Sequence, residues 1–206
     1  MTIRFHKNDL PNLDHYRDCD AVAIDTETLG LNPHRDRLCV VQLSPGDGTA
    51  DVIQIAARPF VPENIAWLLS NPLKTKLFHY GRFDLAMLYN AFGIMAGPVF
   101  CTKIASRLTR TYTDRHGLKD ICRELLGIDL SKVQQSSDWA AETLTPEQIE
   151  YAASDVLYLH RLRDALVARL DREDRRAEAD ACFRFLPTRA KLDLMGWAEE
   201  DIFAHS

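Results

Sequence analysis

The sequence has 206 residues, a net charge of −5 and 46% hydrophobic residues. This length and composition predict one globular domain with its own core, and they exclude a disordered chain, a collagen-like fibre and a coiled-coil rod. The acidic balance argues against a protein that grips long nucleic acids, because such proteins usually present a basic stripe. Residues 101–123 depart from that balance, since six bases and two acids give this stretch a charge of +4.

The sequence predicts a cytoplasmic protein with no membrane segment. Its longest apolar runs, such as residues 38–43, are strand-sized and shorter than a membrane span. The N-terminus lacks the apolar core of a signal peptide. The five cysteines are scattered and include no C-x-x-C pair, so we expect reduced, buried thiols and no zinc ribbon.

The first half of the chain reads mainly as strands. Pro45-Gly-Asp-Gly48 is a turn signal between two apolar runs and predicts a hairpin. Helical spacing follows at residues 63–70, and Gly81 separates a further strand from a helix over 82–92. This order predicts an α/β fold with a mixed sheet. The expected strands are 2–6 (a short edge strand), 20–27, 37–44, 50–55 and 74–79.

The second half is mostly helical. One helix is expected over residues 118–126, ending at Gly127, and another over 146–168, where Thr145 and Pro146 give a start signal. Residues 169–180 are highly charged and read as a solvated helix face. Residues 181–206 are apolar again, so we expect this tail of the single domain 1–206 to pack on the domain or on a neighbouring subunit.

Carboxylates recur at the ends of the predicted elements. Asp25 and Glu27 follow an apolar run two residues apart, so in a strand they face the same side. Asp84 falls in the first turn of the helix after Gly81. Two buried carboxylates repel each other unless a hard divalent cation joins them. The structural alternatives are that Asp25 ends a strand, Glu27 faces water, and Asp84 complements a helix dipole.

A tyrosine and a fourth acid share one face of the predicted helix 146–168. Tyr151 and Asp155 are four residues apart. Aspartate has poor helix propensity, and the neighbours of Asp155 are apolar, so its carboxylate needs either exposure or a partner. The order Asp-x-Glu, Asp, Tyr-x-x-x-Asp is more specific than any one of these motifs.

Together these motifs resemble those of the DEDD superfamily of 3′–5′ exonucleases, in its Tyr-bearing branch. Residues 25–28 (DTET) resemble the first motif, 79–84 (HYGRFD) the second and 151–155 (YAASD) the third. The stretches HGL at 116–118 and SDW at 137–139 are similar to the ribonuclease D catalytic domain. This resemblance spans about residues 1–170, and we expect none of the extra C-terminal helical domains of ribonuclease D after residue 206.

A narrower resemblance is to the nano-RNase C family, carried by DTETLGL, TYTDRHGL and the apolar tail. It implies a ribonuclease H-like fold, with a mixed β-sheet flanked by helices. It also implies hydrolysis of very short RNAs, notably dinucleotides, to 5′-mononucleotides, and assembly as a ring-like homo-octamer. The same chemistry on longer structured RNA, as in ribonuclease D, or on short DNA remains open, as does a non-catalytic binding module on the same fold.

The resemblance also assigns roles to residues. Asp25, Glu27, Asp84 and Asp155 match the acids that hold two divalent ions, Mg²⁺ or Mn²⁺, and Tyr151 matches the residue that orients the attacking water. Five residues become candidate substrate contacts. They are Thr26 between the first two acids, Leu31 as a wedge between bases, His79, and the pair Arg115 and His116 at the 5′ phosphate. Ordinary loop packing, a buried structural histidine and a solvated basic loop are the respective alternatives for the last four.

Overall fold

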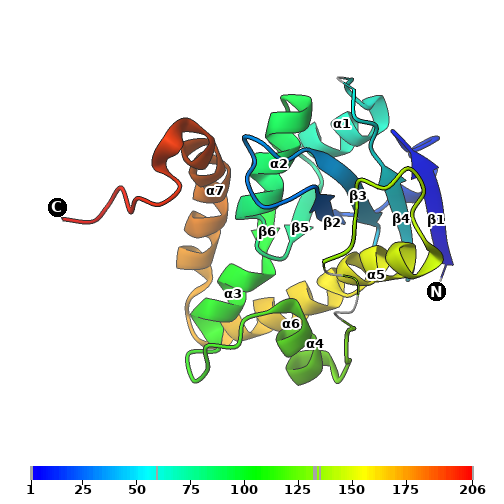
Figure 1. The fold of residues 1–206 in the computed structure, drawn as a ribbon. Coiled ribbons are helices and arrows are strands. Elements are labelled where there is room, and N and C mark those ends of the chain that lie inside the picture. Colours follow the sequence, from blue (N-terminus) through cyan, green and yellow to red (C-terminus); the bar gives the residue numbers. More distant parts are fainter. Residues whose placement is uncertain (1, 59, 132–133, 135, 206) are drawn as a thin grey trace.

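The computed structural model describes residues 2–58, 60–131, 134 and 136–205. In these residues the strands form one six-stranded mixed sheet with the order β1-β4-β3-β2-β5-β6 (Figure 1). The predicted mixed sheet is therefore confirmed. The strands are β1 (Thr2–Lys7), β2 (Ala21–Thr28), β3 (Leu38–Ser44), β4 (Thr49–Gln54), β5 (Thr75–Phe78) and β6 (Val99–Cys101).

β2 lies at the centre of the sheet and joins its two halves. It pairs antiparallel with β3, which forms the predicted hairpin with β4, and it pairs parallel with β5. β1 lies parallel to β4 at one edge, as expected for residues 2–6, and β6 lies parallel to β5 at the other. Every residue of β3 is buried, which explains why it reads as a continuous apolar run.

Helices cover both faces of the sheet. In Figure 1, α1 (Glu63–Ser70) and α2 (Arg82–Phe92) lie on one side, and α5 (Pro146–Leu157) lies on the other, over β2, β3 and β4. α6 (Leu159–Arg172) follows α5 and contacts β2 and β5. The predicted helix 146–168 is thus two helices, because the chain bends at Tyr158, where φ is −107° and ψ is −3°.

The remaining helices surround the β6 edge. α3 (Thr102–Thr109) packs on α6, and α4 (Leu118–Leu126) covers the same helix. The ranges 63–70, 82–92 and 118–126 are confirmed as predicted, whereas β6 and α3 were not expected. No helix among the described residues has the length and hydropathy needed to cross a membrane.

The C-terminal segment is partly packed and partly exposed. α7 (Arg176–Leu192) buries Phe183 and Leu186 against β6 and α2. A single π-helical turn (Asp193–Trp197) follows, and Asp193 accepts hydrogen bonds from Arg82 at the start of α2 and from Arg189. Beyond it the chain extends away from the domain (Figure 1). Several large apolar side chains are exposed in this turn and in the segment that follows it: Met195, Trp197, Ile202 and Phe203.

Candidate active site

Three carboxylates from two elements meet at one end of the sheet. Asp25 and Glu27 lie at the C-terminal end of β2, and Asp155 projects from the last turn of α5. One oxygen from each lies within 4.8 Å of the other two. A capping box between Thr145 and Gln148 fixes the start of α5, and the helix crosses β2, so the helix brings Asp155 to the strand end.

Asp84 approaches from the opposite face of the sheet. Alternation along β2 directs Thr26 away from the face that carries Asp25 and Glu27. The Thr26 hydroxyl donates a 2.6 Å hydrogen bond to Oδ1 of Asp84, which lies in the first turn of α2 and is 4% exposed. The structure thus gives Thr26 a contact that the sequence did not indicate: it holds a carboxylate.

The acids occupy an electrostatically unfavourable environment when no cation is bound. Burial raises the pKa of Asp25 to about 7. Burial and then repulsion from Asp25 raise the pKa of Glu27 to about 10, and the same two causes raise the pKa values of Asp84 and Asp155. No lysine or arginine among the described residues forms an ion pair with any of the four. Oxygen ligands concentrated in this way suit hard divalent cations.

Tyr151 lies one helical turn before Asp155, and its hydroxyl interacts with the Asp155 carboxylate. Burial first, and then the charges of Asp155, Glu27 and Asp25, raise the pKa of this phenol well above its usual value. Its ring centroid lies 6.0 Å from that of Trp139, whose side chain is buried. The phenol therefore keeps its proton at neutral pH and has a fixed direction.

A cavity of about 350 Å³ opens over these groups. Leu31 lies on its wall with 84% of its surface exposed, although it is a large apolar residue. The rest of the wall combines motif residues with residues that sequence reasoning missed. Besides Leu31 and the acids Asp25, Glu27 and Asp155, the wall includes Thr26, His79, Tyr80, Phe83, Lys103, Lys119 and Tyr151.

His79 is held in one tautomer at this wall. Its Nδ1 lies 3.0 Å from Oγ1 of Thr102, and that hydroxyl donates to the carbonyl of Phe78 at 3.2 Å. The hydroxyl therefore accepts from Nδ1–H, which leaves Nε2 as an acceptor. Burial first, and then the charges of Lys103 and His116, lower the pKa of His79 to about 3, so the ring is neutral at physiological pH.

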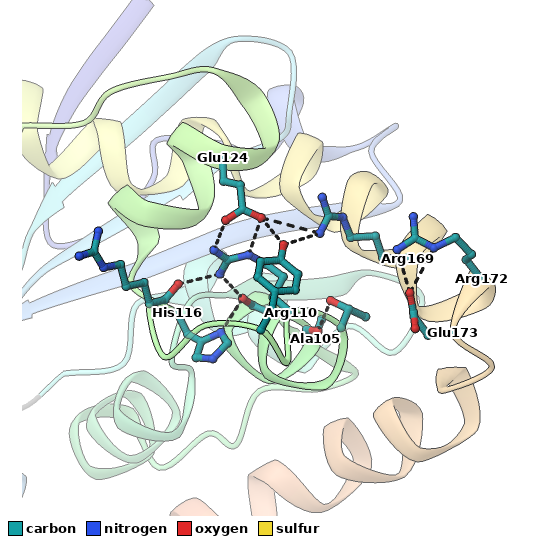
Figure 2. A network of polar contacts seen from close by, with 11 residues as sticks. Ala105, Arg110, His116, Glu124, Arg169, Arg172 and Glu173 are labelled. Atoms are coloured by element: carbon teal, nitrogen blue, oxygen red, sulfur yellow. Dashed lines mark hydrogen bonds and ion pairs between the residues drawn. The ribbon is translucent and has the colours of Figure 1, made fainter.

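Arg115 and His116 belong to a loop that is braced from within (Figure 2). The guanidinium of Arg110, only 1% exposed, donates to Glu124 of α4, to Oγ of Ser106 and to the carbonyl of Arg115. Nδ1 of His116 lies 2.9 Å from the same Ser106 hydroxyl. Neither Arg115 nor His116 lines the cavity over the acids, whereas the next residues along the chain, 117–119, do.

The comparisons with known proteins agree with this geometry. A family model of 3′–5′ exonucleases matches residues 11–171. Ribonuclease D of Acidiphilium cryptum is 35% identical over 154 residues, which are 75% of this chain and 39% of that protein. The chain thus spans about two fifths of the length of the curated relatives it matches.

Solved structures are more similar still. Brucella melitensis NrnC with bound Mg²⁺ is 70% identical with a TM-score of 0.96, and the same protein bound to pGG is 71% identical with a TM-score of 0.97; both matches cover 100% of each chain. Escherichia coli RNase D, an exoribonuclease involved in structured RNA processing, is 28% identical with a TM-score of 0.74. That match covers 84% of this chain and 46% of RNase D.

Proposed function

The chain belongs to the 3′–5′ exonuclease family, and we propose that within it this protein hydrolyses short oligoribonucleotides, notably dinucleotides, to 5′-mononucleotides in the cytoplasm. The observation that carries this proposal is the convergence of Asp25, Glu27 and Asp155 within 4.8 Å, with Asp84 and Tyr151 beside them. Every acid of the family pattern is present, which disfavours a non-catalytic module.

The carboxylates would hold two divalent ions, Mg²⁺ or Mn²⁺. Such ions fit this site for three reasons. Oxygens of three carboxylates lie within 4.8 Å of one another, the pKa values of these carboxyl groups are raised, and none of them forms an ion pair with a lysine or arginine among the described residues. When bound, the ions supply charge neutralisation for the phosphate and for the departing 3′ oxygen. Thr26 would keep Asp84 in place throughout, through the hydroxyl that donates to its carboxylate.

Tyr151 would orient the attacking water. Its pKa is raised, so the phenol is a poor base and a good hydrogen-bond partner at neutral pH. In the proposed reaction water adds to phosphorus, the P–O3′ bond breaks, and the departing 3′ oxygen takes up a proton. The 3′ nucleotide leaves with the phosphate on its 5′ oxygen.

The cavity wall suits a small nucleotide. Leu31 would insert between the two terminal bases, and its exposure supports that role because an 84% exposed leucine gains little from packing in its own loop. His79 would accept a hydrogen bond from a sugar hydroxyl through Nε2, which makes the 2′-hydroxyl of RNA a suitable donor. Arg115 and His116 would reach the 5′ phosphate only from the rim, since they lie outside the cavity wall.

The protein would act as a homo-oligomer, by family resemblance an octamer. The apolar side chains left exposed after α7 support an additional interface, since Met195 and Phe203 are 66% and 78% exposed although both are large and apolar. Static light scattering on the purified protein tests this part, and a monomer mass at working concentration overturns it.

The function is tested with RNAs of two, seven and twenty nucleotides and a DNA dinucleotide, all 5′-labelled, in Mg²⁺ and in EDTA. The Asp84→Asn variant keeps the shape of the side chain and removes its charge. Asp164→Asn removes an exposed carboxylate of α6 and serves as its control.

We expect the wild type and the control to hydrolyse the RNA dinucleotide fastest, only with metal, and the Asp84 variant to be inactive. Equal rates on all RNA lengths favour ribonuclease D-like trimming, and equal rates on DNA favour a general exonuclease. No cleavage by the wild type overturns the proposal.

A further inference from the structure

The turn between β5 and α2 contains an unusual backbone conformation at an aromatic residue. Tyr80 has φ of +66°, in the left-handed region that non-glycine residues rarely occupy. Glycine stands at the next position, where a Cβ would lie 2.6 Å from Cβ of Phe78. Glycine at position 81 thus allows the close approach to Phe78, whereas the strained backbone conformation belongs to Tyr80. Such strain is concentrated at functional sites.

The strained turn exposes the Tyr80 ring in the cavity over the acids. Tyr80 is 48% exposed and forms part of the same wall as Asp25, Glu27 and Asp155. The ammonium of Lys103, in the first turn of α3, lies 4.2 Å from the ring centroid. That distance is well inside the range of a cation–π contact, which favours Lys and Arg over the faces of aromatic rings.

Lys103 has no acidic partner in the part of the chain that the structure describes. Lys103 shares the cavity wall with three carboxylates, yet its ammonium lies over an aromatic ring and pairs with none of them among the described residues. The charge is therefore kept available to a ligand. The other cation on the wall is Lys119, at the start of α4.

We propose that Lys103 binds a phosphate group of the nucleotide substrate, and that Tyr80 is the positioning residue that holds its ammonium at the cavity. This inference rests on the proposed function and adds a residue to it. The phosphates of an oligonucleotide are the anionic groups that enter this cavity, and an ammonium contacts phosphate as a point charge. The Tyr80 ring reduces the number of directions that the long lysine side chain can take.

The structure offers a matched control. Lys191 of α7 lies 5.2 Å from the ring centroid of Tyr89, so it forms the same kind of contact outside the cavity. Lys103→Met and Lys191→Met each remove one positive charge and keep a flexible side chain. Lys103→Arg keeps the charge, Tyr80→Phe keeps the ring, and Tyr80→Ala removes it.

The experiment measures KM and kcat for the RNA dinucleotide in Mg²⁺ at several NaCl concentrations, with thermal melting of each variant to verify folding. For Lys103→Met we expect KM to rise about tenfold with kcat within about threefold of wild type. We also expect the slope of log kcat/KM against log salt to become shallower by about 0.7, the value for one lost contact to a single strand. Tyr80→Ala should raise KM in the same direction. Lys103→Arg and Tyr80→Phe, which keep the charge and the ring, should fall between wild type and Lys103→Met, whereas Lys191→Met should resemble wild type.

A KM and salt slope for Lys103→Met equal to those of Lys191→Met overturn the inference and leave the proposed function intact. Wild-type protein that cleaves no RNA overturns the proposed function itself. A Tyr80→Ala variant with wild-type KM, beside an impaired Lys103→Met, removes the positioning role of the ring.

Discussion

Replacing Glu27 by glutamine should stabilise the metal-free protein while it abolishes hydrolysis. Glu27 carries the repulsion of Asp25, Asp155 and Asp84 in addition to its burial, and its pKa rises from 4.5 to about 10. The folded state therefore binds a proton that the unfolded state has released over this whole pH range. The contribution of Glu27 to the free energy of unfolding is therefore fully present at low pH and is lost as the pH rises toward the pKa of the folded state.

The magnitude follows from that difference of one proton. The free energy of unfolding of the metal-free protein should fall by at most about 1.4 kcal/mol for each pH unit from this group, or about 3 kcal/mol between pH 6 and pH 8. For a domain of this size 1 kcal/mol corresponds to about 2–4 °C in Tm. We thus expect wild-type Tm in EDTA to fall by about 6–11 °C more than Tm of Glu27→Gln over that interval.

The assay is thermal melting of both proteins in EDTA and in Mg²⁺ from pH 6 to pH 8, with Asp164→Asn as the control for an exposed carboxylate. Mg²⁺ binds the ionised acids, so it should raise wild-type Tm most at pH 8 and hardly affect the variant. Equal pH slopes for wild type and Glu27→Gln in EDTA would refute the reasoning, because Glu27 would then be no more repelled than a surface acid.

Three further outcomes follow from single side chains. Tyr151→Phe should lower kcat for the RNA dinucleotide by about 10²-fold with KM within threefold, since it removes only the orienting hydroxyl; unchanged kcat contradicts that role. Leu31→Ala should raise KM and leave Tm within about 1 °C, because the side chain is 84% exposed; a large fall in Tm would instead mark it as packed. Burial lowers the pKa of Lys76 to about 8, so between pH 8 and 10.5 the unfolded state binds more protons than the folded state. The stability of the wild type should therefore rise with pH relative to that of Lys76→Met. A difference in urea midpoint between the two proteins that stays constant across this range contradicts this prediction.

The sequence was most informative where a residue typical of helix ends, such as glycine, threonine or proline, stands at the end of a helix. Gly81 and Gly93 flank α2, and Thr145 with Pro146 starts α5, so both starts were predicted correctly. The break at Tyr158 has no proline or glycine to mark it, and the apolar stripe continues across it. β6 has three residues and depends on pairing with β5, so no local pattern indicates it.

The candidate site shows the same division. The order of the acids and Tyr151 along the chain was sufficient to show the resemblance to the DEDD exonucleases, and that resemblance implied a metal-dependent nuclease. Lys103 and Tyr80 are 23 residues apart, and their contact exists only in three dimensions. The left-handed conformation of Tyr80 is equally invisible, since the adjacent glycine suggests that the turn is unstrained. Arg110 appeared only as one base in a basic stretch, whereas the structure makes it the centre of a buried network (Figure 2).

The acids that meet at the end of β2 come from positions 25, 84 and 155, so their meeting brings together parts of the chain 130 residues apart. During synthesis the strand that carries Asp25 leaves the ribosome long before α5 does. Until α5 has crossed β2, the nascent polypeptide has all six strands of its sheet but an incomplete set of acids. A chain that ends before α5 should therefore be inactive, and activity should begin only when α5 docks on β2.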